Sequence, residues 1–73
     1  MTSDRPPLPG TPPAPVQQAY MAMTPGSAAA FRAHLLGGTS ADWIADTMTR
    51  GGFPMGATRI RVWRRQLRKA GLI

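Results

Sequence analysis

The sequence GATRIRVWRRQLRKAG, residues 56–71, contains six of the nine basic residues of the 73-residue chain and no acidic residue. Its apolar residues fall in one narrow stripe when a helix is drawn at about 100° per residue: Ile60, Trp63, Leu67 and Ala70. Gly56 or Thr58 is expected to begin the helix, and Gly71 is expected to end it. The stretch therefore predicts a helix over residues 57–70 that packs by one edge and exposes the other.

The positive charge of the chain is concentrated in this helix. The formal net charge is +6, and residues 1–56 sum to zero, so residues 57–73 carry all of it. Surface helices usually mix basic and acidic residues and form ion pairs between successive turns, whereas this helix has no acid of its own. A net charge confined to one segment indicates the partner rather than the fold. The pattern favours a polyanion or an anionic surface.

A shorter helix is predicted over residues 25–36, within TPGSAAAFRAHLL. Thr24 or Ser27 is a suitable N-cap, because a hydroxyl there accepts a bond from a free amide of the first turn. Gly37 and Gly38 follow the last apolar residue and are expected to end the helix in a left-handed conformation.

A further helix is predicted over residues 40–50, within TSADWIADTMTR, and Thr39 or Ser40 is its N-cap. One face of this helix is apolar and small: Ala41, Ile44, Ala45 and Met48. The segment GGFPMG, residues 51–56, cannot continue a helix and is predicted to be a turn. Its Phe53 and Met55 are expected to fill the space between the flanking helices.

The N-terminal segment MTSDRPPLPGTPPAP, residues 1–15, contains six of the eight prolines. Proline lacks a backbone donor and favours extended neighbours, so this segment is predicted to be mobile. Residues 16–23 either form a short helix or dock on the core through Tyr20 and Met23. The predicted organisation is a flexible arm over residues 1–23 and a domain over residues 24–73. The fold class is all-α, a small three-helix bundle with a disordered proline-rich arm.

Several functional classes lack the residues that they need. The chain has no cysteine, so disulfides and thiolate metal sites are excluded. His34 is the only histidine, and no nucleophile–base pair can be assembled around it. The longest apolar runs are a few residues, far short of the roughly 20 of a membrane span. We expect no enzymatic activity, cofactor, metal, membrane partner or small-molecule substrate. The expected location is the cytoplasm.

The stretch TSADWIADTMTRGGFPMGATRIRVWRRQL, residues 39–67, resembles the small helix-turn-helix DNA-binding proteins of actinobacterial phages and related mobile elements. In those proteins an alanine-rich helix with the pattern SAxWIA precedes a glycine- and proline-containing turn. The next helix opens with a small residue and Thr, followed by Ile, Arg and an aromatic residue. The turn is long here, since fifteen positions separate Ala45 from Ile60, where compact units have about ten. The resemblance implies a helix-turn-helix fold and double-stranded DNA as the partner.

The exposed face of the predicted helix over residues 57–70 divides into two groups of candidate site residues. Four are expected to read base edges in the major groove, because they lie nearest the helix N-terminus: Thr58, Arg61, Val62 and Arg65. Four more basic residues are expected to bind phosphates: Arg59, Arg64, Arg68 and Lys69. Trp63 is assigned to the core, whereas Trp43 is a candidate contact for a phosphate or a partner chain.

The leading interpretation is a sequence-specific transcriptional regulator of a phage or mobile element, nucleoid-associated in a bacterial host. A DNA-packaging or recombination accessory factor would use the same helix and is the first alternative. The second alternative is a small inhibitor that binds an acidic host protein. RNA remains as a partner, although no aromatic pair is placed for base stacking. A homodimer would bury extra surface through Phe31, Leu35 and residues 20–23.

Overall fold

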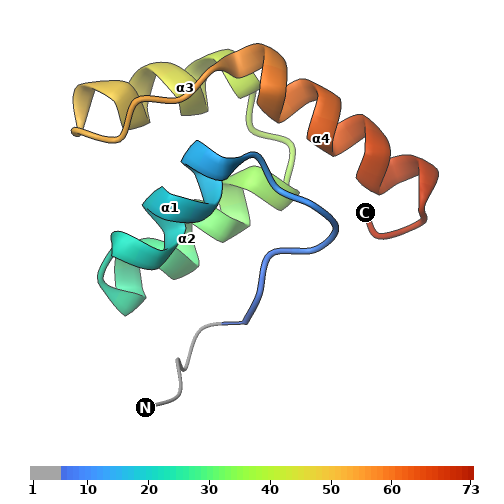
Figure 1. Cartoon of the computed structure of the whole chain (residues 1–73), viewed down its shortest axis with the longest axis horizontal. Helices are drawn as coiled ribbons and strands as arrows, with labels where there is room; N and C mark the ends of the chain where they lie inside the picture. Colours follow the sequence, from blue (N-terminus) through green and yellow to red (C-terminus); the bar gives the residue numbers. More distant parts are fainter. Residues whose placement is uncertain (1–5) are drawn as a thin grey trace.

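The structure is a computed structural model that describes residues 6–73, and the regular elements in that range are all helices. They are α1 (Ala14–Ala22), α2 (Pro25–Leu36), α3 (Ala41–Arg50) and α4 (Ala57–Lys69). In Figure 1, α1 and α2 form an antiparallel pair, and α3 and α4 lie on the other side of the molecule. The all-α class and the three predicted helices are confirmed.

The predicted number of helices is wrong, because α1 is a fourth helix of nine residues. Pro15 lies in its first turn, where a missing backbone donor costs nothing. Val16, Ala19 and Tyr20 are buried, so α1 belongs to the core. The short helix that was one alternative for residues 16–23 is thus confirmed, although it begins earlier, at Ala14.

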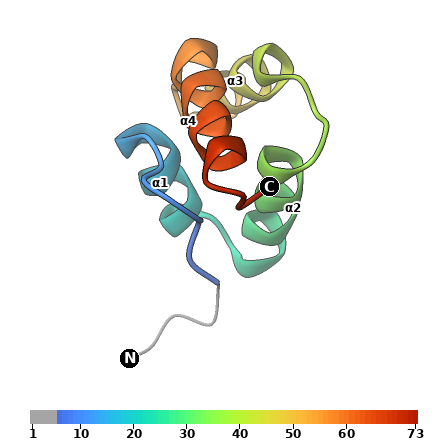
Figure 2. The ribbon, with the colours of Figure 1, turned by 90° about the vertical axis from the view of Figure 1, so that its right-hand side faces the viewer.

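Residues 6–13, here called the strap, pack against the bundle and correct the prediction of a mobile arm. Leu8 is buried, and the carbonyl of Pro6 accepts a hydrogen bond from the Tyr20 hydroxyl. The carbonyl of Pro9 accepts a bond of 3.1 Å from Trp63 Nε1 on α4. The strap is thus bonded to both α1 and α4, and Figure 2 shows its blue trace beside α1. The first part of the predicted arm, residues 1–5, lies outside the described residues.

Glycine is required where the strap passes α4. Gly10 has a φ of +66°, and a Cβ built on it would lie 2.7 Å from a methyl carbon of Leu67. The left-handed backbone would strain any larger residue, and the Leu67 side chain would also have to shift to admit its Cβ.

Hydroxyl side chains cap the start of two helices, and glycines end two. Thr24 accepts a bond from the Ser27 amide at the start of α2, and Ser40 accepts one from the Trp43 amide at the start of α3. Past the ends of α3 and α4, Gly52 and Gly71 have positive φ values of +96° and +73°. The amides of Phe53 and Leu72 then reach back to the carbonyls of Met48 and Leu67, the arrangement of a glycine-terminated helix.

The end of α2 differs from this pattern. Gly37 has a φ of −94°, and Gly38 is not among the residues with positive φ, so the predicted left-handed ending is wrong. The carbonyls at this end of α2 therefore need other partners, because the last turn of a helix leaves its acceptors free.

A single core receives side chains from the strap and from all four described helices. Its largest fully buried members come from α1, α2, α3 and α4: Trp63, Tyr20, Leu35, Ile44, Ile60, Leu67 and Val16. Phe53 and Met55 of the turn are half-buried against it, as predicted. Phe31 and Leu35, the expected dimer contacts, are buried within the chain, as are Tyr20 and Met23. These residues are therefore not a free surface. None of the described helices has the length and apolar character needed to cross a membrane.

Candidate functional site

Helix α4 has one buried stripe and one exposed cationic face. Ile60, Trp63 and Leu67 point into the core and are at most 1% exposed, which confirms that Trp63 is a core residue. Ala70 does not extend the stripe as predicted, because it is the C-cap and is exposed. The connection over residues 51–56 returns along α3, so α4 starts beside α3 rather than beyond its end (Figure 1). The buried stripe thereby fixes which face of α4 meets solvent.

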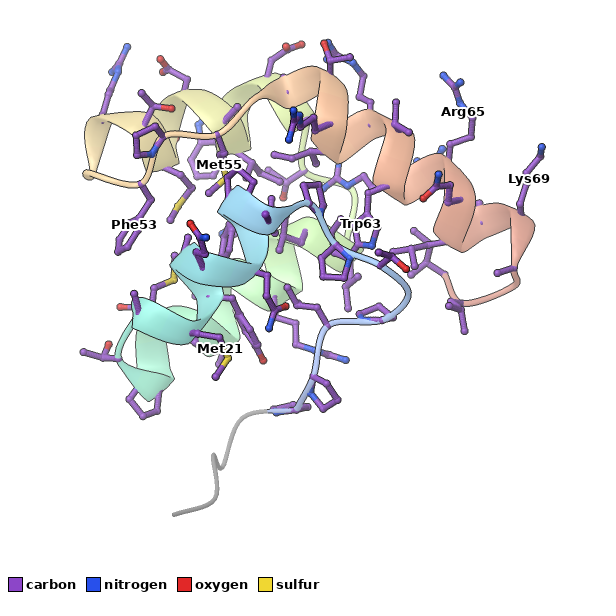
Figure 3. All side chains as sticks on the ribbon, in the orientation of Figure 1. Met21, Phe53, Met55, Trp63, Arg65 and Lys69 are labelled. Carbon is purple, nitrogen blue, oxygen red and sulfur yellow. The ribbon has the colours of Figure 1, made fainter. Side chains whose placement is uncertain are left out.

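The four predicted base-reading residues are all exposed on α4: Thr58, Arg61, Val62 and Arg65. Val62 is one of the few large apolar side chains that the described surface exposes. Arg65 points away from the bundle, and Lys69 lies one turn further along on the same side (Figure 3). An apolar residue between arginines gives this face both apolar and cationic contacts.

Arg61 has a carboxylate partner on the neighbouring helix. Its Nη1 lies 3.0 Å from Oδ1 of Asp42 in the first turn of α3. The two side chains are 50% and 78% exposed, respectively, so water screens the pair. Exposed pairs of this kind contribute about 0–1 kcal/mol to stability. The pair therefore orients Arg61 more than it stabilises the fold.

Arg64 is a structural residue, which corrects its assignment to phosphate binding. Its side chain is only 7% exposed and reaches the C-terminal end of α2. Nε donates to the carbonyl of Leu35 at 2.8 Å, Nη2 to His34 at 2.7 Å, and Nη1 to Thr39 at 2.6 Å. The carbonyls of His34 and Leu35 belong to the last turn of α2. Gly37, which follows that turn, does not adopt the left-handed conformation. The guanidinium therefore caps the C-terminal end of α2, where a left-handed glycine is absent.

Burial of Arg64 changes its electrostatics without removing its charge. Desolvation lowers the pKa of its guanidinium, and repulsion from Arg68 lowers it further. An arginine side chain nevertheless stays protonated at neutral pH. Three carbonyl oxygens surround the cation in place of water. The charge of Arg64 is thus bound by carbonyl groups of the protein, while the charge of Arg68 is exposed to solvent.

The remaining predicted phosphate-binding residues, Arg59, Arg68 and Lys69, are exposed. Residues 6–73 contain two side-chain carboxylates, and each already has a partner: Asp42 pairs with Arg61, and Asp46 pairs with Arg50 at 3.1 Å. No described side-chain carboxylate pairs with the other exposed basic residues of α4: Arg59, Arg65, Arg68 and Lys69. This face therefore carries four positive charges without a side-chain counter-ion.

A second surface feature is a groove lined by residues of α2 and α3. The rings of His34 and Trp43 are tilted against each other with centroids 5.3 Å apart, and His34 Nδ1 is 2.8 Å from Thr39 Oγ1. They border a mainly apolar groove of about 570 Å³ that reaches Phe31 and Phe53. Sequence reasoning singled out Trp43 but missed the groove, because its walls come from α2, from α3 and from the residues just before α2 and just after α3.

The described residues contain no group of three or more His, Cys, Asp or Glu side chains suited to a metal ion. The two distinct features of the described surface are the cationic face of α4 and the apolar groove.

Comparison with models of protein families, with curated proteins and with solved structures gives no match to this chain.

Proposed function

We propose that the chain is a sequence-specific DNA-binding protein, a regulator of phage or mobile-element type, that places α4 in the major groove. The observation that carries the proposal is the exposed face of α4, with four basic side chains that pair with none of the side-chain carboxylates in residues 6–73. The phosphates of a duplex supply such partners at regular spacing, and their neutralisation releases bound counter-ions. The resemblance of residues 39–67 to small helix-turn-helix proteins supports the same proposal.

The anchoring of α4 suits a recognition helix. Its buried stripe packs on the core, and Arg64 ties it to the end of α2. A helix held in this way presents the same face to every ligand, so its side chains meet the groove in a fixed register. A solvated polycationic tail has no such constraint and binds phosphates without reading bases.

Two groups of residues on this face have different proposed roles. Arg61 and Arg65 read base edges, with Thr58 and Val62 beside them. All four positions face outward, and three of them lie in the first two turns of α4. The other exposed basic residues of α4 bind phosphates: Arg59, Arg68 and Lys69. A guanidinium can donate two parallel bonds to a guanine edge, whereas a lysine acts on a phosphate as a point charge.

The test is a salt series of duplex binding with the full chain. Duplexes are enriched from a randomised library, and fluorescence anisotropy then compares the enriched duplex with random-sequence duplex. The expected result is enrichment of a defined site, bound about a thousandfold or more tighter than random DNA. Affinity for both duplexes should fall linearly on a logarithmic salt scale.

Single substitutions then separate the two roles. Arg65→Ala should weaken binding to the enriched duplex by about 1–3 kcal/mol and relax the preference at one base pair. Arg68→Ala should weaken both duplexes alike and lower the salt slope by about one unit. Arg50→Ala is the matched control, since Arg50 lies on α3 and pairs with Asp46, and it should change binding least.

Two results would overturn the proposal. If no sequence is enriched, the chain is a generic polycation. If the substitutions on α4 leave DNA binding unchanged but weaken binding to an acidic protein, the inhibitor alternative replaces it.

A further inference from the structure

We infer that Asp42 is a positioning residue, which holds the Arg61 guanidinium in a reading orientation and so raises discrimination between DNA sequences. The inference rests on the proposed function of α4. Asp42 belongs to the first turn of α3, and its Oδ1 lies 3.0 Å from Nη1 of Arg61. Nineteen positions separate the two residues in the sequence. The fold therefore brings a carboxylate to the cationic face of α4, which has none of its own.

The ion pair adds little to stability, although an anion in the first turn of α3 is itself favoured by the helix dipole. Both side chains are at least half exposed, so the pair lies in water and contributes little to folding. For binding, a carboxylate on this face repels every phosphate backbone and weakens affinity for all sequences alike. The Asp42 carboxylate therefore lowers affinity on the proposed DNA-binding face. Its benefit is that it restricts the side-chain conformations of Arg61.

The geometry leaves Arg61 able to read a base. A guanidinium has five N–H donors, and the bond to Asp42 uses one on Nη1. The four others are sufficient for two parallel bonds to a guanine edge. A long side chain already held by a carboxylate loses less rotamer freedom on binding. It is also less available to swing to a neighbouring phosphate, which would bind every sequence equally.

The second acid of α3 provides a matched control. Asp46 lies one helical turn after Asp42, is also exposed, and pairs with Arg50 of the same helix instead of a residue of α4. Asp42→Ala and Asp46→Ala each raise the net charge by one. Any effect of overall charge is therefore common to both variants, and an effect through Arg61 is specific to the first.

The experiment measures the ratio of affinities for the enriched duplex and random-sequence duplex by anisotropy, together with the melting temperature. Both variants should bind random duplex somewhat more tightly and keep the helical signal of the parent, and Asp42→Ala should also lower the melting temperature slightly, because it removes an anion from the first turn of α3. Asp42→Ala should lower the affinity ratio about fivefold, part of the discrimination that one bidentate arginine supplies. Asp46→Ala should leave the ratio unchanged. Equal ratios for the two variants would overturn the inference.

A double-substitution cycle shows whether Asp42 acts through Arg61. In the Arg61→Ala background, Asp42→Ala should no longer change the affinity ratio, because the guanidinium that it positions is absent. The same change of ratio in both backgrounds would contradict a positioning role. The failure of the proposed function is visible separately: the parent chain itself would then not distinguish the enriched duplex from random DNA.

Discussion

Arg64 and Arg65 are adjacent on α4, yet the two faces of the helix give the same side chain opposite surroundings. Arg64 is buried and donates to three carbonyl oxygens around the end of α2, whereas Arg65 is exposed and pairs with no described carboxylate. The inward guanidinium completes the fold, and the outward one is available to a ligand. Charge counted along a sequence therefore overstates the charge offered to a partner, and the direction of each side chain decides the difference.

The largest expected effect separates the two tryptophans. Trp63→Ala should unfold the domain, because truncating a buried aromatic costs about 3–5 kcal/mol and a small domain has little more to lose. It also removes the donor to the Pro9 carbonyl. Circular dichroism and thermal melting measure the loss. Trp43 is 51% exposed, so Trp43→Ala should keep the helical signal. A Trp63→Ala protein that melts like its parent would contradict the two-faced description of α4.

The two arginines give the next largest difference. Arg64→Ala should destabilise the domain by about 2–4 kcal/mol, because it leaves the carbonyls of His34 and Leu35 without their charged donor. Arg65→Ala should change stability by no more than about 0.5 kcal/mol, with urea unfolding as the measurement. Arg64→Lys should recover a part only, since one ammonium cannot follow the guanidinium fork. Equal losses for Arg64→Ala and Arg65→Ala would remove the distinction between the faces.

The smallest of the three differences tests the strap. Leu8→Ala should lower the free energy of unfolding by about 2 kcal/mol, at the low end for a buried leucine, because a terminal segment can detach without opening the rest of the core. Leu72 is exposed at the other end of the chain, and Leu72→Ala should be within about 0.5 kcal/mol of the parent. If Leu8→Ala has no effect on unfolding, the strap contributes no stability.

The features that sequence predicted well depend on interactions between near neighbours. An N-cap bond spans three residues, so the sequence alone narrowed each cap to two candidates, of which the structure uses Thr24 and Ser40. The stripe formed by Ile60, Trp63 and Leu67 likewise follows from the helical repeat alone. These local rules sufficed for the bounds of α2, α3 and α4.

The features that were missed depend on contacts between distant segments. The role of Arg64 requires knowing that the end of α2 lies beside α4, and its only sequence signal was a position next to the apolar stripe. Leu8 lies among prolines whose composition favours mobility, so one apolar residue gave little indication that the strap packs. The Asp42–Arg61 pair was also unpredictable, because it depends on how the long turn over residues 51–56 returns α4 to the start of α3.

The bond between Pro9 and Trp63 has a consequence for how the chain folds during its synthesis. The two residues are 54 positions apart, so the strap leaves the ribosome long before its partner exists. Helices α1 and α2 can pair earlier, since their contacts are close in sequence. The strap has no indole to bind until most of α4 has emerged. The native core is consequently completed only after Trp63 has emerged, and a nascent chain that stalls before Trp63 leaves the strap without its indole partner.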